Sequence, residues 1–254
     1  MNQSATRINR LAKRLPAKTY LEIGVFKGET FVDVAIPEKT AVDPAFNFDV
    51  SVYKNDKNIR ALEVTSSDFF KTLREEKAKT GISPLYDIIF LDGLHTFRQT
   101  FHDFLDTMPY SHPETIWIFD DTAPYDPFCA IPNQRISYRY RAAFGIGGKP
   151  WHGDVFKCVF AIHDFYPFFS YATVYGVGNP QTVVWRTQKA SDRVRLFGDM
   201  EQISRLTYFD LLGRLDALHP VKDEELDAKI GEIFVKAAQP AEQFLKNFIV
   251  PFRK

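Results

Sequence analysis

Segment 20–30 constrains the fold of this chain more than any other part of the sequence. It reads YLEIGVFKGET, so an apolar run leads into Glu22, Gly24 and Gly28 with the spacing E-x-G-x-x-x-G. Glycine is needed where a ligand must approach the backbone closely. A helix that begins after such a turn offers its free N–H groups to an anion. We therefore predict a buried strand, a glycine turn and a helix over 28–35.

Strands and helices are expected to alternate along the first half of the chain. The strands fall near 20–25, 40–43, 59–65, 86–92 and 114–120, and the helices near 28–35, 67–79 and 96–108. In the last helix, Phe97, Phe101 and Phe104 have the spacing of one helix face. This alternation predicts an α/β fold with a doubly wound, mostly parallel sheet. Such sheets bind ligands beyond the carboxyl ends of their strands, so chemistry is expected there.

The second predicted strand ends in an acid, Asp43, which Pro44 follows. In nucleotide-binding α/β folds, an acid at this place accepts hydrogen bonds from the ribose hydroxyls. The alternative is a surface aspartate that begins a proline turn. The position of Asp43 after the glycine turn favours the ribose role.

Carboxylates also end the fourth and fifth predicted strands. Asp92 and, three residues later, His95 follow the fourth strand, and Asp120 and Asp121 follow the fifth. Neighbouring strand ends would bring three like charges into one crevice, which is costly unless a cation binds or protons are taken up. Oxygen ligands of this kind suit Mg²⁺, with Ca²⁺ or Mn²⁺ as alternatives. The alternative roles are structural: a turn-fixing His95, a loop-capping acid pair and an Asp121 that points to solvent.

Taken together, these motifs resemble the class I S-adenosylmethionine (SAM) dependent methyltransferases. The acidic set is similar to that of the bacterial metal-dependent O-methyltransferases of the macrocin and macrolide-sugar type, and more loosely to catechol O-methyltransferase. The resemblance implies a seven-stranded Rossmann-like sheet, whose far edge the expected hairpin at 170–187 would supply. It also implies that Asp92, Asp120 and Asp121 hold Mg²⁺ and that His95 is the base. Catechol O-methyltransferase has lysine as base and asparagine as last ligand, and in both respects this sequence sides with the sugar enzymes.

The same resemblance implies how SAM is held. The glycine turn would bind its methionine part, Asp43 its ribose, and the residues after the third strand its adenine; the alternative for Ser67 and Asp68 is a helix N-cap. The cofactor-binding residues expected are Glu22, Gly24, Val25, Gly28, Thr30, Asp43, Ser67, Asp68 and Asp92.

Bulk properties limit the other classes. Residues 1–197 are expected to form the methyltransferase domain, and 198–254 a helical extension that packs on it or on a second subunit. A net charge of +0 argues against a broad basic face for nucleic acid. The two cysteines are too few for a disulfide framework. The polar N-terminus and the lack of a run of ~18 apolar residues predict a cytoplasmic protein outside the membrane.

We therefore expect metal-assisted methyl transfer from SAM to a hydroxyl of a small molecule such as a sugar, polyketide or phenol. One alternative is a nucleic-acid or protein methyltransferase on the same platform, against which the neutral charge weighs. Another is a non-catalytic SAM-binding scaffold that dimerises through 198–254. A nicotinamide oxidoreductase is least favoured, because the glycine spacing is not G-x-G-x-x-G.

Overall fold

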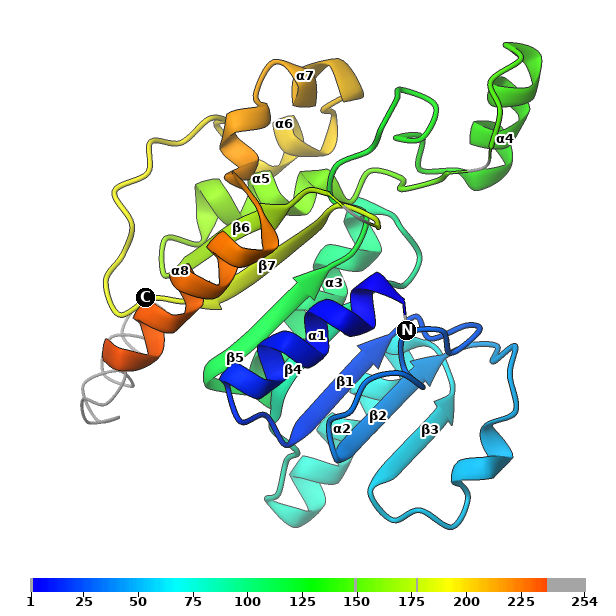
Figure 1. Cartoon of the computed structure of the whole chain (residues 1–254), viewed down its shortest axis with the longest axis vertical. Coiled ribbons are helices and arrows are strands. Elements are labelled where there is room, and N and C mark those ends of the chain that lie inside the picture. Colours follow the sequence, from blue (N-terminus) through cyan, green and yellow to red (C-terminus); the bar gives the residue numbers. More distant parts are fainter. Residues whose placement is uncertain (1, 149, 177, 237–254) are drawn as a thin grey trace.

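An eight-stranded sheet in the order β3-β2-β1-β4-β5-β7-β6-β8 forms the centre of the computed structural model, which describes residues 2–148, 150–176 and 178–236 (Figure 1). The strands are β1 Thr19–Ile23, β2 Glu38–Asp43, β3 Ile59–Glu63, β4 Tyr86–Leu91, β5 Ser111–Phe119, β6 Phe169–Val174, β7 Gln181–Arg186 and β8 Pro220–Val221. Strands β1 to β5 are parallel, and β7 is antiparallel to both β5 and β6. The predicted doubly wound sheet and its edge hairpin are confirmed. The eighth strand is additional: it pairs two residues in parallel with the end of β6.

Helices cover both faces of the sheet. They are α1 Gln3–Arg14, η1 Val50–Tyr53, α2 Ser66–Thr80, α3 Phe97–Thr107, η2 Met108–Tyr110, α4 Gln134–Ala143, α5 Phe156–Phe165, α6 Met200–Ser204, α7 Tyr208–Leu212, η3 Leu215–Leu218 and α8 Asp223–Lys236. In Figure 1, α1 and α8 lie across one face, while α2, α3 and α5 lie behind the other. Side chains of a strand alternate between the faces. Thus Tyr20 belongs to the core under α1, and Leu21 to the core under α2 and α3.

The helix expected over 28–35 is wrong, because this segment forms turns. Its carbonyls have other donors: the buried Lys39 Nζ donates to the oxygens of Phe31 and Val34, at 2.8 and 3.0 Å. From α1, Asn9 donates to the oxygen of Asp33 and accepts from the nitrogen of Ala35. The segment is therefore tied to β2 and α1, and α1 takes the place on the sheet that the expected helix would have filled.

The chain after residue 198 is helical, as expected, and packs on the sheet domain. Ile203, Leu211 and Leu218 are buried in the core beneath α5, and Leu226 and Ile230 in the core beside α1. The apolar pattern that we expect to continue through 237–254 lies outside the described residues. The domain division at 197/198 and a role in dimerisation stay predictions. None of the described helices is long and apolar enough to cross a membrane.

Candidate active site

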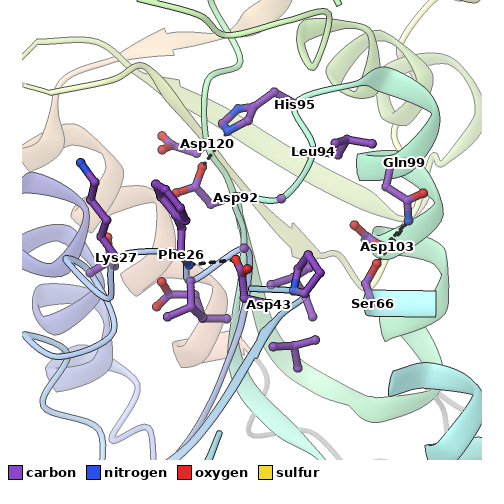
Figure 2. A pocket seen from close by; sticks show the side chains of 18 of the residues that line it. Phe26, Lys27, Asp43, Ser66, Asp92, Leu94, His95, Gln99, Asp103 and Asp120 are labelled. Carbon is purple, nitrogen blue, oxygen red and sulfur yellow. Dashed lines mark hydrogen bonds and ion pairs between the residues drawn. The ribbon is translucent and has the colours of Figure 1, made fainter. Parts of the chain in front are cut away.

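A cavity of about 800 Å³ opens at the carboxyl ends of the central strands (Figure 2). Most of the site residues predicted from the sequence line it: Glu22, Gly24, Val25, Thr30, Asp43, Ser67, Asp92, His95 and Asp120. Gly28, Asp68 and Asp121 are not among the lining residues. The strand ends thus gather residues from positions 22 to 120 around one space, as a doubly wound sheet does.

Gly24 closes the turn after β1 at a point where no side chain fits. Its N–H donates to the oxygen of Val42 at 2.9 Å, and the nitrogen of Asp92 donates to the oxygen of Ile23 at 2.8 Å, so the turn is fixed between β2 and β4. Gly24 has a φ of +90°, and a Cβ built on it would lie 2.0 Å from the oxygen of Asp92. The close approach at this glycine is made by the backbone after β4, and the predicted approach of a ligand stays a prediction.

The carboxylate of Asp43 is held rigidly at the end of β2. Its Oδ2 accepts from the nitrogen of Phe26, and its Oδ1 from the nitrogen of Ala45, both at 2.8 Å. Each carboxylate oxygen has a further lone pair, so both can still accept from a diol. The backbone therefore presents Asp43 to the cavity in one orientation, which suits ribose recognition.

The helix end that faces the cavity belongs to α1. Asn2, the N-cap of α1, donates from Nδ2 to the Oγ1 of the buried Thr30 at 2.8 Å, and Asn2 and Ser4 both line the cavity. The sequence predicts that a helix at 28–35, after the glycine turn, binds the anion. In the structure, the helix N-terminus at the cavity is that of α1. An asparagine N-cap before a helical stretch was the signal for it.

Three acids converge beside this turn, at the ends of β4 and β5. Burial and the charges of Asp120 and Asp121 raise the pKa of Asp92 well above its ordinary value. Burial and the charge of Asp121 raise the pKa of Asp120 to about 6, although Gln181 Nε2 donates to its Oδ1 at 2.9 Å. The predicted convergence is confirmed, and it has the predicted electrostatic cost: the site favours either protons or a cation.

His95 lies against this acidic group and pairs with Asp121. Its Nδ1 is 2.8 Å from Asp121 Oδ2, and its Nε2 is 3.7 Å from Asp92 Oδ1. Burial lowers the pKa of His95, but the hydrogen bond to Asp121 and the nearby carboxylates outweigh burial, so the pKa is raised overall. A carboxylate bound to Nδ1 fixes the ring and leaves Nε2 as the atom that can exchange a proton.

The loop geometry around this pair is unusual. Both His95 and Asp121 have positive φ values, of 53° and 60°, a conformation that costs energy in residues other than glycine. Gly153 lies against the first of these turns, since a Cβ on it would be 1.7 Å from the oxygen of His95. The neighbouring His152 is buried, with Nε2 3.3 Å from Asp121 Oδ1. The backbone thus holds an imidazole on either side of Asp121.

The ligand set for a cation differs from the one predicted. Ligand atoms of Asp92, His95 and Asp121 all lie within 4.8 Å of one another, whereas Asp120 is outside this group. Oδ1 of Asp121 is buried without a hydrogen-bond partner among the described residues. A buried carboxylate oxygen in that state is costly, and a divalent cation would satisfy it. The residues therefore fit a hard cation, and a ligand role for Asp120 stays a prediction.

The residues after β3 divide between two roles. Thr65 caps α2 by donating from Oγ1 to Asp68 Oδ2 at 2.8 Å, while the nitrogen of Asp68 donates back to Thr65 Oγ1 at 3.1 Å. The N-cap of α2 is therefore Thr65, and Asp68 is the third residue of the helix, so the N-cap alternative for Ser67 and Asp68 is wrong by two or three residues. A contact of Asp68 with adenine stays a prediction. Ser67 and its neighbour Ser66 both line the cavity.

Three further residues at the cavity or the acidic group are not among those predicted from the sequence. Gln134 and Trp151 line the cavity next to His95, whose ring centroid is 4.9 Å from that of Trp151. Both come from the part of the chain between β5 and α5. His152 had no visible partner in the sequence, because its contact with Asp121 depends on how that connection folds back.

Comparisons with known proteins agree with this geometry. Residues 21–122 match the model of a family described as a methyltransferase domain. This segment of the chain is therefore similar in sequence to a methyltransferase domain. The match runs from within β1 to just after β5 and includes the acidic group. No curated protein matches the sequence.

Solved structures match this chain at low sequence identity, and the first one described below has a similar fold. A Staphylococcus aureus protein described as a caffeoyl-CoA O-methyltransferase is 14% identical, with a TM-score of 0.52 over 74% of this chain and 84% of its own. An O-methyltransferase from Bacillus cereus in complex with S-adenosylhomocysteine (SAH) is 13% identical, with a TM-score of 0.48 over 72% and 80%. A Klebsiella pneumoniae protein described as an O-methyltransferase is 17% identical, with a TM-score of 0.45 over 72% and 79%. The cavity at the strand ends is where α/β folds of this kind bind their ligands.

Proposed function

We propose that this enzyme transfers the methyl group of SAM to a hydroxyl of a small molecule, with His95 as general base. The observation that carries the proposal is the Asp121–His95 pair, 2.8 Å apart, at the rim of the cofactor cavity. An oriented imidazole whose pKa is raised by neighbouring carboxylates is well suited to take a proton from a hydroxyl. An amine acceptor would have less need of a base, because a neutral amine already carries a free lone pair.

The chemistry follows from the position of each group. Asp121 holds the His95 ring so that Nε2 faces Asp92 and receives the hydroxyl proton. The acceptor oxygen then forms a bond to the methyl carbon as the carbon–sulfur bond of SAM breaks, leaving a methyl ether, SAH and an imidazolium. Asp121 stabilises that imidazolium, as a carboxylate does in catalytic triads. Orientation by the cavity walls supplies much of the rate.

The proposal includes a divalent cation, for which Mg²⁺ is the first candidate. Asp92 and Asp121 would hold it, with His95 or Asp120 nearby. When bound, such an ion would lower the pKa of the acceptor hydroxyl.

A small hydroxylated acceptor is supported by the outer wall of the cavity. Trp151 and the 61%-exposed Leu94 give this wall an apolar surface, and Gln134 adds an amide. Sugars, polyketides and phenols all combine an apolar face with hydroxyls. A cytoplasmic location belongs to the same proposal, and the two free, buried cysteines support it because such thiols persist in reducing compartments.

Methyl transfer from radiolabelled SAM to a panel of catechols, hydroxylated polyketides and sugars tests the proposal. We expect a methyl ether whose formation falls with EDTA and returns with Mg²⁺. The variant His95→Ala should keep SAH binding, and its turnover should fall by a factor of about 10²–10⁴, which is the range for the loss of a general base. His102→Ala is the matched control, since His102 is exposed on α3. Turnover by His95→Ala close to that of wild type would refute the base role.

A further inference from the structure

Three polar side chains form a cluster on the cavity wall that the methyl-transfer chemistry does not use. Asp103 and Gln99 come from α3, and Ser66 is the first residue of α2. Gln99 Nε2 donates to Asp103 Oδ1 at 2.9 Å and to Ser66 Oγ at 3.2 Å. All three residues line the cavity. A tie between two helices does not by itself require a carboxylate in the cavity wall.

Asp103 is a buried acid without a cationic partner. Its residue is 3% exposed, and no lysine or arginine of the described segments pairs with it. Burial raises the pKa of Asp103 to about 6, while the hydrogen bonds from Ser66 and Gln99 oppose this shift. Asp103 therefore remains an anion at neutral pH. A buried anion that faces a cavity is stabilised when a ligand brings a donor to it.

The position of the cluster matches one part of SAM. The reacting methyl group must lie beside His95 and Asp92, and the ribose beside Asp43. The purine is attached to C1′ of the ribose and the sulfur to C5′, on opposite sides of the ring oxygen, so the purine extends to the other side of Asp43. Figure 2 shows the cluster on that side, away from Asp92 and Asp120. Oδ2 of Asp103 lies 3.7 Å from the position that a Cβ would take on Gly93, which also lines the cavity.

The geometry points to Asp103 as the residue that reads the purine of the cofactor, by accepting a hydrogen bond from the 6-amino group of adenine. Both amide hydrogens of Gln99 are used within the cluster, so Asp103 is the anionic acceptor that remains. This inference rests on SAM as cofactor and not on the proposed base or metal. Asp103 would select an amino-purine over a 6-oxo-purine, because a carbonyl there would oppose the carboxylate.

Calorimetric binding of SAH and of its analogue with hypoxanthine in place of adenine tests the inference without any turnover. We expect wild type to prefer SAH by at least ~10-fold, because the analogue leaves a buried acceptor unpaired. In Asp103→Asn, SAH affinity should fall by about 10-fold and the preference should narrow to within about 3-fold, since an amide can accept or donate. Thermal melts of each variant show whether it is folded.

The control is Asp106→Asn, on the same helix, where Asp106 pairs with Arg74 at 3.1 Å outside the cavity. This variant should keep the preference of wild type. An unchanged preference in Asp103→Asn would show that the cluster only ties α2 to α3. A wild type that binds both ligands equally overturns the inference and leaves the proposed function standing, whereas one that binds neither overturns the cofactor assignment as well.

Discussion

Glu22 lies beneath the cofactor cavity with its carboxyl group almost removed from water. The residue is 1% exposed, and the hydroxyl of Tyr20 donates to its Oε2 at 2.6 Å. Burial raises the pKa of Glu22 from an ordinary 4.5 to about 8, although Tyr20 and Lys39 oppose the shift. At neutral pH, Glu22 is therefore mostly a neutral acid, which spares the site a fourth negative charge.

A pH-dependent stability follows from this shift. Between pH 4.5 and 8, the folded chain keeps the Glu22 proton that the unfolded chain loses. The free energy of unfolding therefore falls as pH rises through this window, by at most ~5 kcal/mol from this group. Glu22→Gln removes the titration and keeps an acceptor for Tyr20. Thermal melts from pH 5 to 8 should show the variant gaining stability relative to wild type, and a constant difference across the window would contradict the assignment.

Single residues also show the limits of the sequence. Glu22, Asp43, Asp92 and His95 were found because they end strands that the local pattern predicts. Asp103 sits in the middle of a helix, where an acid normally indicates a solvated face, and only the packing of α3 beside the cavity buries it.

At the scale of elements, two glycines differ in how much space surrounds them: Gly24 follows β1, and Gly81 is the C-cap of α2. Gly24 and Gly81 have left-handed φ values of +90° and +72°, but their surroundings differ. A Cβ on Gly24 would meet the backbone of Asp92 at 2.0 Å, whereas a Cβ on Gly81 would meet nothing within 4 Å.

This contrast gives a matched pair of variants. Gly81→Ala should lower the free energy of unfolding by about 1 kcal/mol, because alanine is less stable than glycine in a left-handed conformation. Gly24→Ala adds a backbone collision that must displace the end of β4 and with it Asp92, so it should be markedly less stable and should lose SAH binding. Denaturant unfolding and calorimetry measure the two effects. Equal stabilities would show that the turn yields without moving β4.

Elements that depend on local pattern were predicted, and those that depend on distant partners were not. The short apolar runs of the central strands and the amphipathic pattern of α3 can be recognised from hydrophobic spacing alone. The turns at 28–35 exist because Lys39 and Asn9 satisfy backbone oxygens there, and these contacts depend on β2 and α1 packing against the segment. The helical propensity of segment 28–35 gives no information about these contacts.

Across the whole molecule, a buried chain of polar contacts connects the two ends of the described sequence to the acidic site. Arg7 on α1 donates to Asp223 on α8 at 2.8 Å and also to Gln181 on β7. Gln181 in turn donates to Asp120 at 2.9 Å. Arg7 and Asp223 are 216 positions apart, so no local pattern could have predicted their pairing. Helix α8 of the C-terminal extension therefore packs on the same face of the sheet as α1.

Removing Asp223 should therefore destabilise the enzyme. The side chain of Arg7 is 3% exposed and that of Asp223 27% exposed, so Asp223→Ala leaves a buried guanidinium without its carboxylate. The cost should be about 1–3 kcal/mol, between that of a surface ion pair and that of a fully buried one. The control is Glu224→Ala, at an exposed position of the same helix, which should change stability by less than ~0.5 kcal/mol. Urea unfolding measures the free energy of unfolding of both variants. If the two values are equal, the hydrogen bond to Gln181 is sufficient to hold Arg7, and α8 stabilises the fold through its apolar face without a contribution from the ion pair.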